Sequence, residues 1–279
     1  MSTSYVGSPV LSTSITIPVD GDLANANSVN VSAKALADND YYLMRSLGQI
    51  PESTAPIRIT SLSPFVGQVT VEPIPFAVVT ENGVYKTLST NAPVTLGSAA
   101  IEGGGNFLPN TIYFIYMYSV AGVANWQLST TPPDTNRLYK QGGTTHKYIA
   151  SVPTDGNTPG VPYSLARSRG NTAFIQDVSP QTVNNTTETP LSIVSLIVPR
   201  FATKVALYCR VSAPVMVSAF GYIVTIPGST GMPLFAKAGS TTNFYLEVPT
   251  NPATTGALLS GRVSSAGTIM DVRVRGYME

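Results

Sequence analysis

The sequence predicts a mainly β protein in which antiparallel β-sandwich domains follow a short N-terminal anchor segment that is helical or extended. Three observations support this fold class. Apolar and polar residues alternate with period two from Pro56 onward, turn sequences separate the alternating stretches, and the one convincing helical pattern precedes Pro56. Short strands without helical windows between them indicate an antiparallel sandwich or barrel. We expect an anchor at 1–55 and β-sandwich domains at 56–176 and 177–279.

The anchor segment carries a single apolar stripe with helical spacing. Its apolar residues follow one another at alternating spacings of four and three, broken once by Asp40. Polar residues at 27–30 can cap the helix start, and Gly48 followed by Pro51 ends the helix. A helix this short does not form a self-sufficient coiled coil, so the stripe needs a partner surface. The predicted interface residues in this stripe are Val29, Leu36, Leu43 and Leu47.

Two series of predicted strands follow the anchor. The first comprises residues 57–62, 66–72, 76–80, 84–88, 94–96, 111–120, 124–129, 137–140 and 146–152. The second comprises residues 191–199, 203–211, 215–225, 243–248, 257–264 and 268–277. Turn sequences such as Glu81-Asn82-Gly83 separate the strands. Between the two series, the polar segment SPQTVNNTTETP predicts a linker or a long inter-strand loop.

The strand TIYFIYMYSV is unusual because both of its faces carry bulky apolar side chains. An ordinary sandwich strand buries one face and exposes the other to water. A strand with two apolar faces has its second face covered by a neighbouring domain or subunit, or displays aromatic rings for a ligand. We therefore predict that Tyr113, Tyr116 and Tyr118 belong to an assembly interface. Trp126, on the next strand, is the candidate for ligand stacking in the alternative interpretation.

The charge content disfavours several partners. Lys and Arg number 16 and Asp and Glu number 15, so no basic field is available to hold a nucleic-acid backbone. Charged residues make up only 11% of the chain, which suits a protein packed inside an assembly, although extracellular β proteins share this composition. No apolar run is long enough to span a bilayer, and the first residues do not resemble a signal peptide. We expect synthesis in a host cytoplasm and no membrane insertion.

The sequence offers little chemistry, and we predict no catalytic, cofactor-binding or metal-binding residue. His146 is the only histidine and lies in a strand-like stretch, which favours a structural role. Cys209 is the only cysteine and has apolar neighbours, which favours a small buried side chain over a reactive thiol. Asp20 and Asp22 lack the glycine and terminal carboxylate of calcium loops. A glycan hydrolase stays an alternative, with its acids drawn from Glu72, Glu81, Glu102, Asp134 and Asp155.

Two stretches resemble parts of phage proteins. The opening IPVDGDLANANSVNVSAKALADNDYYL resembles an N-terminal segment shared by phage and prophage structural proteins, with an Asp-Gly-Asp turn and an Ala-Leu-Ala-Asp step. LPNTIYFIYMYSV, followed by WQLSTTPPDTNRLYKQGGTTHKYIASVPTD, is similar to a β module of the same proteins. That module has an aromatic-rich strand and a Ser-Thr-Thr-x-Pro-Asp turn. The two stretches cover about a third of the chain, and the C-terminal hundred residues share neither pattern.

The resemblance implies a virion component of a tailed bacteriophage that docks through its N-terminal segment and projects its β domains. Its partners would be other virion proteins of the tail, baseplate, portal or capsid, and its own copies in a homo-oligomer, with a trimer preferred. Two alternatives stay open, of which the first needs the same anchor and domains. One is a capsid decoration or head-fibre protein, and the other is a carbohydrate-binding receptor module for a host surface glycan.

Overall fold

The computed structural model describes Asn39 and residues 57–61, 67–74, 77–168, 171–175, 178–225, 229–250 and 258–278. The predicted anchor, with its interface residues Val29, Leu36, Leu43 and Leu47, lies outside the described residues. The structure therefore concerns the β-rich part of the chain.

This part is mainly β, as predicted, and all pairings between its named strands are antiparallel. The first half contains β1 (Ile57–Ser61), β2 (Val69–Val71), β3 (Ala77–Glu81), β4 (Val84–Leu88), β5 (Val94–Leu96), η1 (Ser98–Ala100), β6 (Ile112–Val120), β7 (Val123–Ser129), β8 (His146–Pro153), β9 (Leu165–Ser168) and β10 (Asn171–Phe174). The second half contains β11 (Gln181–Val183), β12 (Thr189–Pro190), α2 (Ser192–Ile197), β13 (Lys204–Ser212), β14 (Ala219–Val224), β15 (Met232–Ala236), β16 (Thr241–Pro249), β17 (Ser260–Val263) and β18 (Ile269–Met278).

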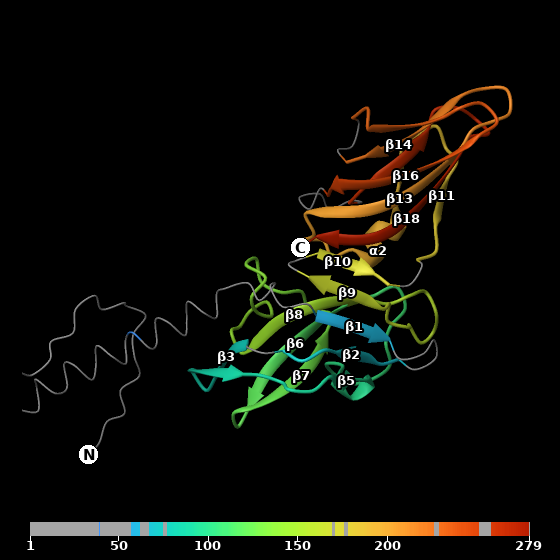
Figure 1. The fold of residues 1–279 in the computed structure, drawn as a ribbon. Helices are drawn as coiled ribbons and strands as arrows, with labels where there is room; N and C mark the ends of the chain where they lie inside the picture. Colours follow the sequence, from blue (N-terminus) through green and yellow to red (C-terminus); the bar gives the residue numbers. More distant parts are fainter. Residues whose placement is uncertain are drawn as a thin grey trace, which may run out of the picture.

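The described elements form two lobes, each with its own apolar core (Figure 1). In the first lobe the core lies between the three-stranded sheet β7-β6-β8 and the strands β2, β3 and β5. In the second lobe the core lies between the strands β13 and β18 and the four-stranded sheet β12-β17-β14-β15, with α2 packed at the same core. Alternation sends every second side chain of β13 inward, including Val205, Leu207 and Cys209.

One long sheet connects the two lobes, with the order β16-β13-β18-β10-β9-β1-β2-β5. Figure 1 shows β9 and β10 at the junction between the lobes. Along one edge, β18 pairs with β10 near the chain end and with β11 further back. A Cβ atom at Gly276 would lie only 2.3 Å from the carbonyl oxygen of Thr172, so a side chain does not fit at this crossing. The hydroxyl of Tyr277 lies 2.7 Å from that of Ser151 on β8, which adds a buried hydrogen bond across the junction.

Several details differ from the sequence-based expectation, beginning with strands β9, β10 and β15, which lie outside the predicted ranges. Residues 191–199 were expected to form a strand, but Ser192–Ile197 is the helix α2, because Leu191, Val194 and Ile197 reach the core at a spacing of three. The predicted linker SPQTVNNTTETP contains β11 and β12, which pair with β18 and β17. Residues 137–140 contribute isolated bridges instead of a strand.

The close approach at Gly276 predicts a measurable cost of a side chain there. Gly276→Ala is expected to lower the free energy of unfolding by about 1–3 kcal/mol, because β10 must move away from β18. Urea denaturation measures this cost. The matched control is Gly143→Ala, where the nearest side-chain atom is 3.9 Å from the new Cβ and the change should stay within about 0.5 kcal/mol. Equal losses of unfolding free energy in the two variants would contradict the close approach of β10 and β18 at Gly276.

The buried cysteine gives an independent test of the second core. Burial raises the pKa of the Cys209 thiol to about 12, so thiolate is scarce at pH 8 and reagent has no access. We expect a disulfide reagent such as dithionitrobenzoate to leave the native protein unlabelled and to label it when urea unfolds it. Rapid stoichiometric labelling of the native protein would contradict the position of Cys209 inside the core.

Candidate functional site

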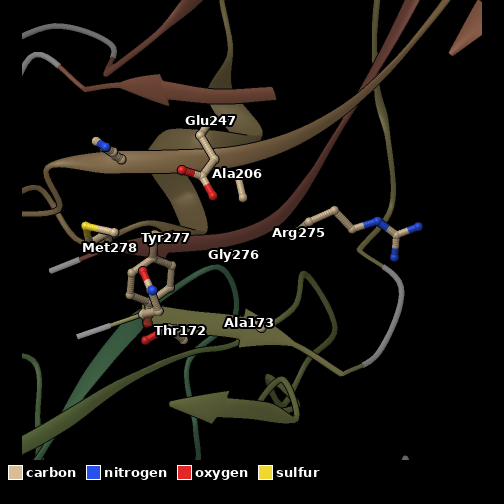
Figure 2. Close-up of a pocket in the computed structure, with 10 residues that line it drawn as sticks. Thr172, Ala173, Ala206, Glu247, Arg275, Gly276, Tyr277 and Met278 are labelled. Carbon is tan, nitrogen blue, oxygen red and sulfur yellow. The ribbon is translucent and has the colours of Figure 1, made fainter. Parts of the chain in front are cut away.

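A hollow lies on the outer face of the long sheet, near the junction of the two lobes (Figure 2). It has a volume of about 170 Å³. Its floor is one row of small residues on three neighbouring strands, because Ala173 faces Gly276 and Gly276 faces Ala206 in the strand registers. Glu247 follows Ala206 in the same row, and its carboxylate points into the hollow in Figure 2. Lys204, which is exposed, borders the next row.

The small residues explain why the sheet is hollowed at this place. The carbonyl of Thr172 excludes a side chain at Gly276, as described above. The neighbouring positions carry only the methyl groups of Ala173 and Ala206. The close pairing of β10 with β18 that connects the lobes therefore also leaves a depression on the outer face of the sheet.

Next to the hollow, two tyrosines and an arginine form a second row across the sheet. Tyr208 on β13 faces Arg273 on β18 and Tyr245 on β16. The two tyrosine rings lie 5.0 Å apart between centroids, at an angle of 52°. Tyr245 is 77% exposed, so its ring is open to solvent. A broad aromatic surface thus adjoins the hollow.

Further arginines surround Tyr208. Its ring centroid lies 5.7 Å from the guanidinium carbon of Arg275, a cation–π distance. The register of β18 against β13 shifts beside Arg275, and Figure 2 shows its side chain extending away from the hollow. Arg210 lies two positions further along β13 on the same face and is exposed. In the part of the chain that the structure describes, neither Arg210 nor Arg273 forms an ion pair.

The outer face therefore concentrates positive charge on a chain that has almost no net charge. Four cations stand in these rows, namely Lys204, Arg210, Arg273 and Arg275. Two carboxylates accompany them, Glu247 beside the hollow and Asp271 facing Arg210. The Asp271 carboxylate accepts a hydrogen bond of 2.7 Å from Thr182. The arrangement can bind through ring stacking and through donors to anionic or hydroxyl groups.

Two of the tyrosines predicted for an assembly interface are buried within the chain. Tyr113 is 1% exposed and lies in the core of the first lobe, while Tyr116 is 0% exposed on the opposite face of β6. Tyr148 and Phe201 cover the second face of β6, and Phe201 comes from the second half of the chain. The Tyr116 hydroxyl donates to the carbonyl of Thr131. The expected cover of the second apolar face is thus supplied internally, and these two side chains leave no surface for another subunit.

The remaining predicted aromatic residues lie near the end of the β7-β6-β8 sheet. Tyr118 is partly buried, and its ring stacks on His146 at a centroid distance of 4.6 Å. Burial, with the charge of Lys140, lowers the pKa of His146 below 6.5, while Glu102 opposes this shift. Trp126 is partly buried and packs against the core of the first lobe, away from Tyr208 and Tyr245. The interface role of Tyr118 stays a prediction.

Among the described residues, no group of three or more His, Cys, Asp or Glu side chains could hold a metal ion. Four of the five acids of the hydrolase alternative, Glu81, Glu102, Asp134 and Asp155, accept hydrogen bonds from other described residues. Glu102 pairs with Lys140 at 2.5 Å and accepts from Ser129. Asp134 accepts from the backbone of Leu138. None of the helices that the structure describes has the length and apolar character needed to cross a membrane.

The sequence analysis missed the residues of the outer face, although a pattern for them was present. In KVALYCRVS, Tyr208 and Arg210 occupy the polar phase of the alternation, opposite Leu207 and Cys209. In TTNFYLEVP, Tyr245 holds the same phase. A tyrosine in the exposed phase of two strands was the available indication. Their adjacency was not available, because it depends on the pairing of β13 with β16.

In comparisons with known proteins, no protein-family model matches the chain, and no curated protein sequence matches it.

A carboxylate clasp in the first lobe yields a pH prediction. Glu81 accepts hydrogen bonds from the Ser119 hydroxyl at 2.8 Å and from the backbone N–H groups of Ala121 and Gly122. The hydrogen bond from Ser119, aided by the two backbone donors and Lys86, lowers the pKa of Glu81 below 4.5. The ionised carboxylate therefore stabilises the fold above pH 4.5, and this contribution is lost as the pH falls through the lower folded-state pKa.

We expect Glu81→Gln to reduce the free energy of unfolding at pH 7, and the difference from the natural protein to disappear as the pH falls below 4.5. Urea denaturation at a series of pH values measures both. Glu72→Gln is the control, because Glu72 makes no hydrogen bond or ion pair with another described residue. A difference in the free energy of unfolding that does not change with pH would contradict the stabilising role of the ionised Glu81 carboxylate.

Proposed function

We propose that this protein is a structural component of a tailed bacteriophage virion, a fibre, tail or baseplate protein. It docks through residues 1–55 and projects its β domains. The observation that carries the proposal is the resemblance of the opening stretch and of the aromatic-rich module to parts of phage structural proteins. The described fold is compatible with it, because the module forms β6, β7 and β8 and buries its aromatic strand.

The finer architecture belongs to the same proposal. We assign β-sandwich domains to 56–176 and 177–279, supported by the two separate core clusters and by the two sheets that enclose the second cluster. The continuous sheet through β10 and β18 fits two domains held in one fixed arrangement. The protein works as a homo-oligomer, with a trimer preferred, and without catalytic activity. A capsid decoration or head-fibre role differs only in the docking position, which imaging of virions distinguishes.

A second candidate function is carbohydrate binding, as a receptor module for a host surface glycan. The specific observation in its favour is the outer face, where exposed Tyr245 and its neighbour Tyr208 adjoin a hollow of sugar-ring size. Such a module projects from a virion in the same way, so the two functions are compatible. Trp126, the earlier candidate for stacking, packs against the first core and is a weaker choice.

The docking role of the anchor can be tested by adding charge to its apolar stripe. Burying each of Leu36 and Leu43 in an interface is worth roughly 1.5–3 kcal/mol, and a buried carboxylate adds a further cost. The double variant Leu36→Asp/Leu43→Asp is expected to fold normally by circular dichroism. It should sediment as a smaller species and be lost from particles, as detected by immunoblot of purified virions.

The matched control is Leu108→Asp, which adds a carboxylate at a leucine that is 55% exposed on the first lobe. It should keep both oligomeric state and incorporation. Normal incorporation of the double variant would contradict the proposal that the stripe docks the protein. Absence of the natural protein from purified particles would overturn the virion proposal as a whole.

A further inference from the structure

We infer that the outer face of β16, β13 and β18 binds an acidic glycan, in which some of the sugars carry carboxylate groups. The inference rests on the second proposed function, carbohydrate binding, and names the class of glycan. It is carried by the juxtaposition, on one sheet face, of Arg210 and Arg273, which form no ion pair among the described residues, of the exposed Tyr245 ring and of the hollow.

The arginines determine the charge of the ligand. Arg273 faces Tyr208 across the strands, Arg275 lies over the same ring, and Arg210 stands two residues along β13. A guanidinium is planar and presents paired N–H donors that match the two oxygens of a carboxylate. Arg210 and Arg273 have no ion-pair partner in the described part of the chain. The face is therefore complementary to a ligand with several carboxylates.

The tyrosines and the hollow indicate a sugar as the carrier of those carboxylates. The exposed ring of Tyr245 offers a flat apolar surface on which the C–H face of a sugar ring can stack. The hollow beside it, floored by Ala173, Gly276 and Ala206, has room for one sugar ring. The Glu247 carboxylate points into the hollow and can accept a hydrogen bond from a sugar hydroxyl.

The two carboxylates of the face argue against a nucleic acid. Glu247 stands at the hollow, and Asp271 faces Arg210 at the other end of the rows. A polyanion with a phosphate at every unit would bring negative charge against both. A glycan can place neutral hydroxyl groups at those two positions and its carboxylates at the arginines between them.

A protein partner is also less suited to this face. On the proposed face the exposed apolar side chains are Tyr245 and Ile269, whereas a larger number lie elsewhere in the second lobe, on β14, on β15 and on the loop before β14. They are Val215, Met216, Val217, Phe220 and Phe235. A partner that gains affinity from burying apolar surface would bind there. The face around Tyr208 offers isolated rings among charges, which suits a hydrated, anionic chain.

The test uses the full chain and four immobilised polymers of different chemistry. Polygalacturonate and polysialic acid carry carboxylates, dextran is neutral, and dextran sulfate carries sulfate esters; an oligo-dT strand in solution competes. Binding is measured by biolayer interferometry at low and at physiological salt. We expect the protein to bind one or both carboxylate polymers, more weakly as salt rises. Dextran should not bind, and oligo-dT should not compete.

Variants locate the site. Arg210→Gln and Arg273→Gln are each expected to weaken carboxylate-polymer binding by about tenfold, because each removes charge-assisted hydrogen bonds. Tyr245→Ala should weaken it as well, through the lost stacking surface. The matched control is Arg262→Gln, since Arg262 also forms a cation–π pair, with Tyr222 at 4.8 Å, but on the opposite sheet. This control should bind as the natural protein does. Circular dichroism verifies the fold of each variant.

Several outcomes would overturn the inference. These are binding of neither carboxylate polymer, preference for dextran sulfate alone, displacement by oligo-dT, or an equal loss in the Arg262→Gln control. Failure here is separate from failure of the virion role, because incorporation into particles depends on the anchor stripe and is measured without any glycan. A protein that enters virions but binds none of the polymers keeps the structural function and loses this inference.

Discussion

The pairing of the last strand with β10 is the constraint on which the rest of the described structure depends. At Gly276 the backbone of β10 approaches so closely that no side chain fits, and the next residue, Tyr277, joins β8 through Ser151. Because β18 also pairs along its length with β13, this single strand holds both lobes in one sheet. The junction therefore depends on a long-range contact, since its two sides are about a hundred residues apart in sequence.

The same constraint produces the candidate site. The exclusion of side chains at the crossing leaves the row of small residues that forms the hollow. Because the side chains of a strand alternate between its two faces, the residues that fill the core are not those of the candidate binding face. On β13, Leu207 and Cys209 point into the core. The alternate residues Tyr208 and Arg210 point outward. Exchange of the outer residues changes the chemistry of the face without creating a cavity in the core, so this face can vary while the fold is kept.

The sequence was sufficient for most strands and insufficient for their partners. Residues 84–88 and 94–96 form strands with the predicted bounds, because alternation and turn residues are local. Short strands such as β9, β10 and β15 were missed, since they have too few residues to show a period and depend on neighbours distant in sequence. Helix α2 was mistaken for a strand because an apolar run of this length satisfies either period. The outer face escaped prediction because its rows join three strands.

Aromatic residues of this chain lie in two kinds of position, buried on β6 and outward-facing on β13 and β16. On β6, aromatic rings point to both faces of the strand, and other parts of the chain cover both faces. The rings of one face lie in the core of the first lobe, and those of the other face pack against Tyr148 and Phe201. Those rings report internal packing between the halves of the chain. Tyr208 and Tyr245 instead face each other across β13 and β16, in the polar phase of strands whose other phase is apolar. Packing does not require a ring at such a position, since a short polar residue would solvate the face equally well. The exposed ring of Tyr245, on the same face as Arg210 and Arg273, is therefore an observation in favour of the proposed ligand site.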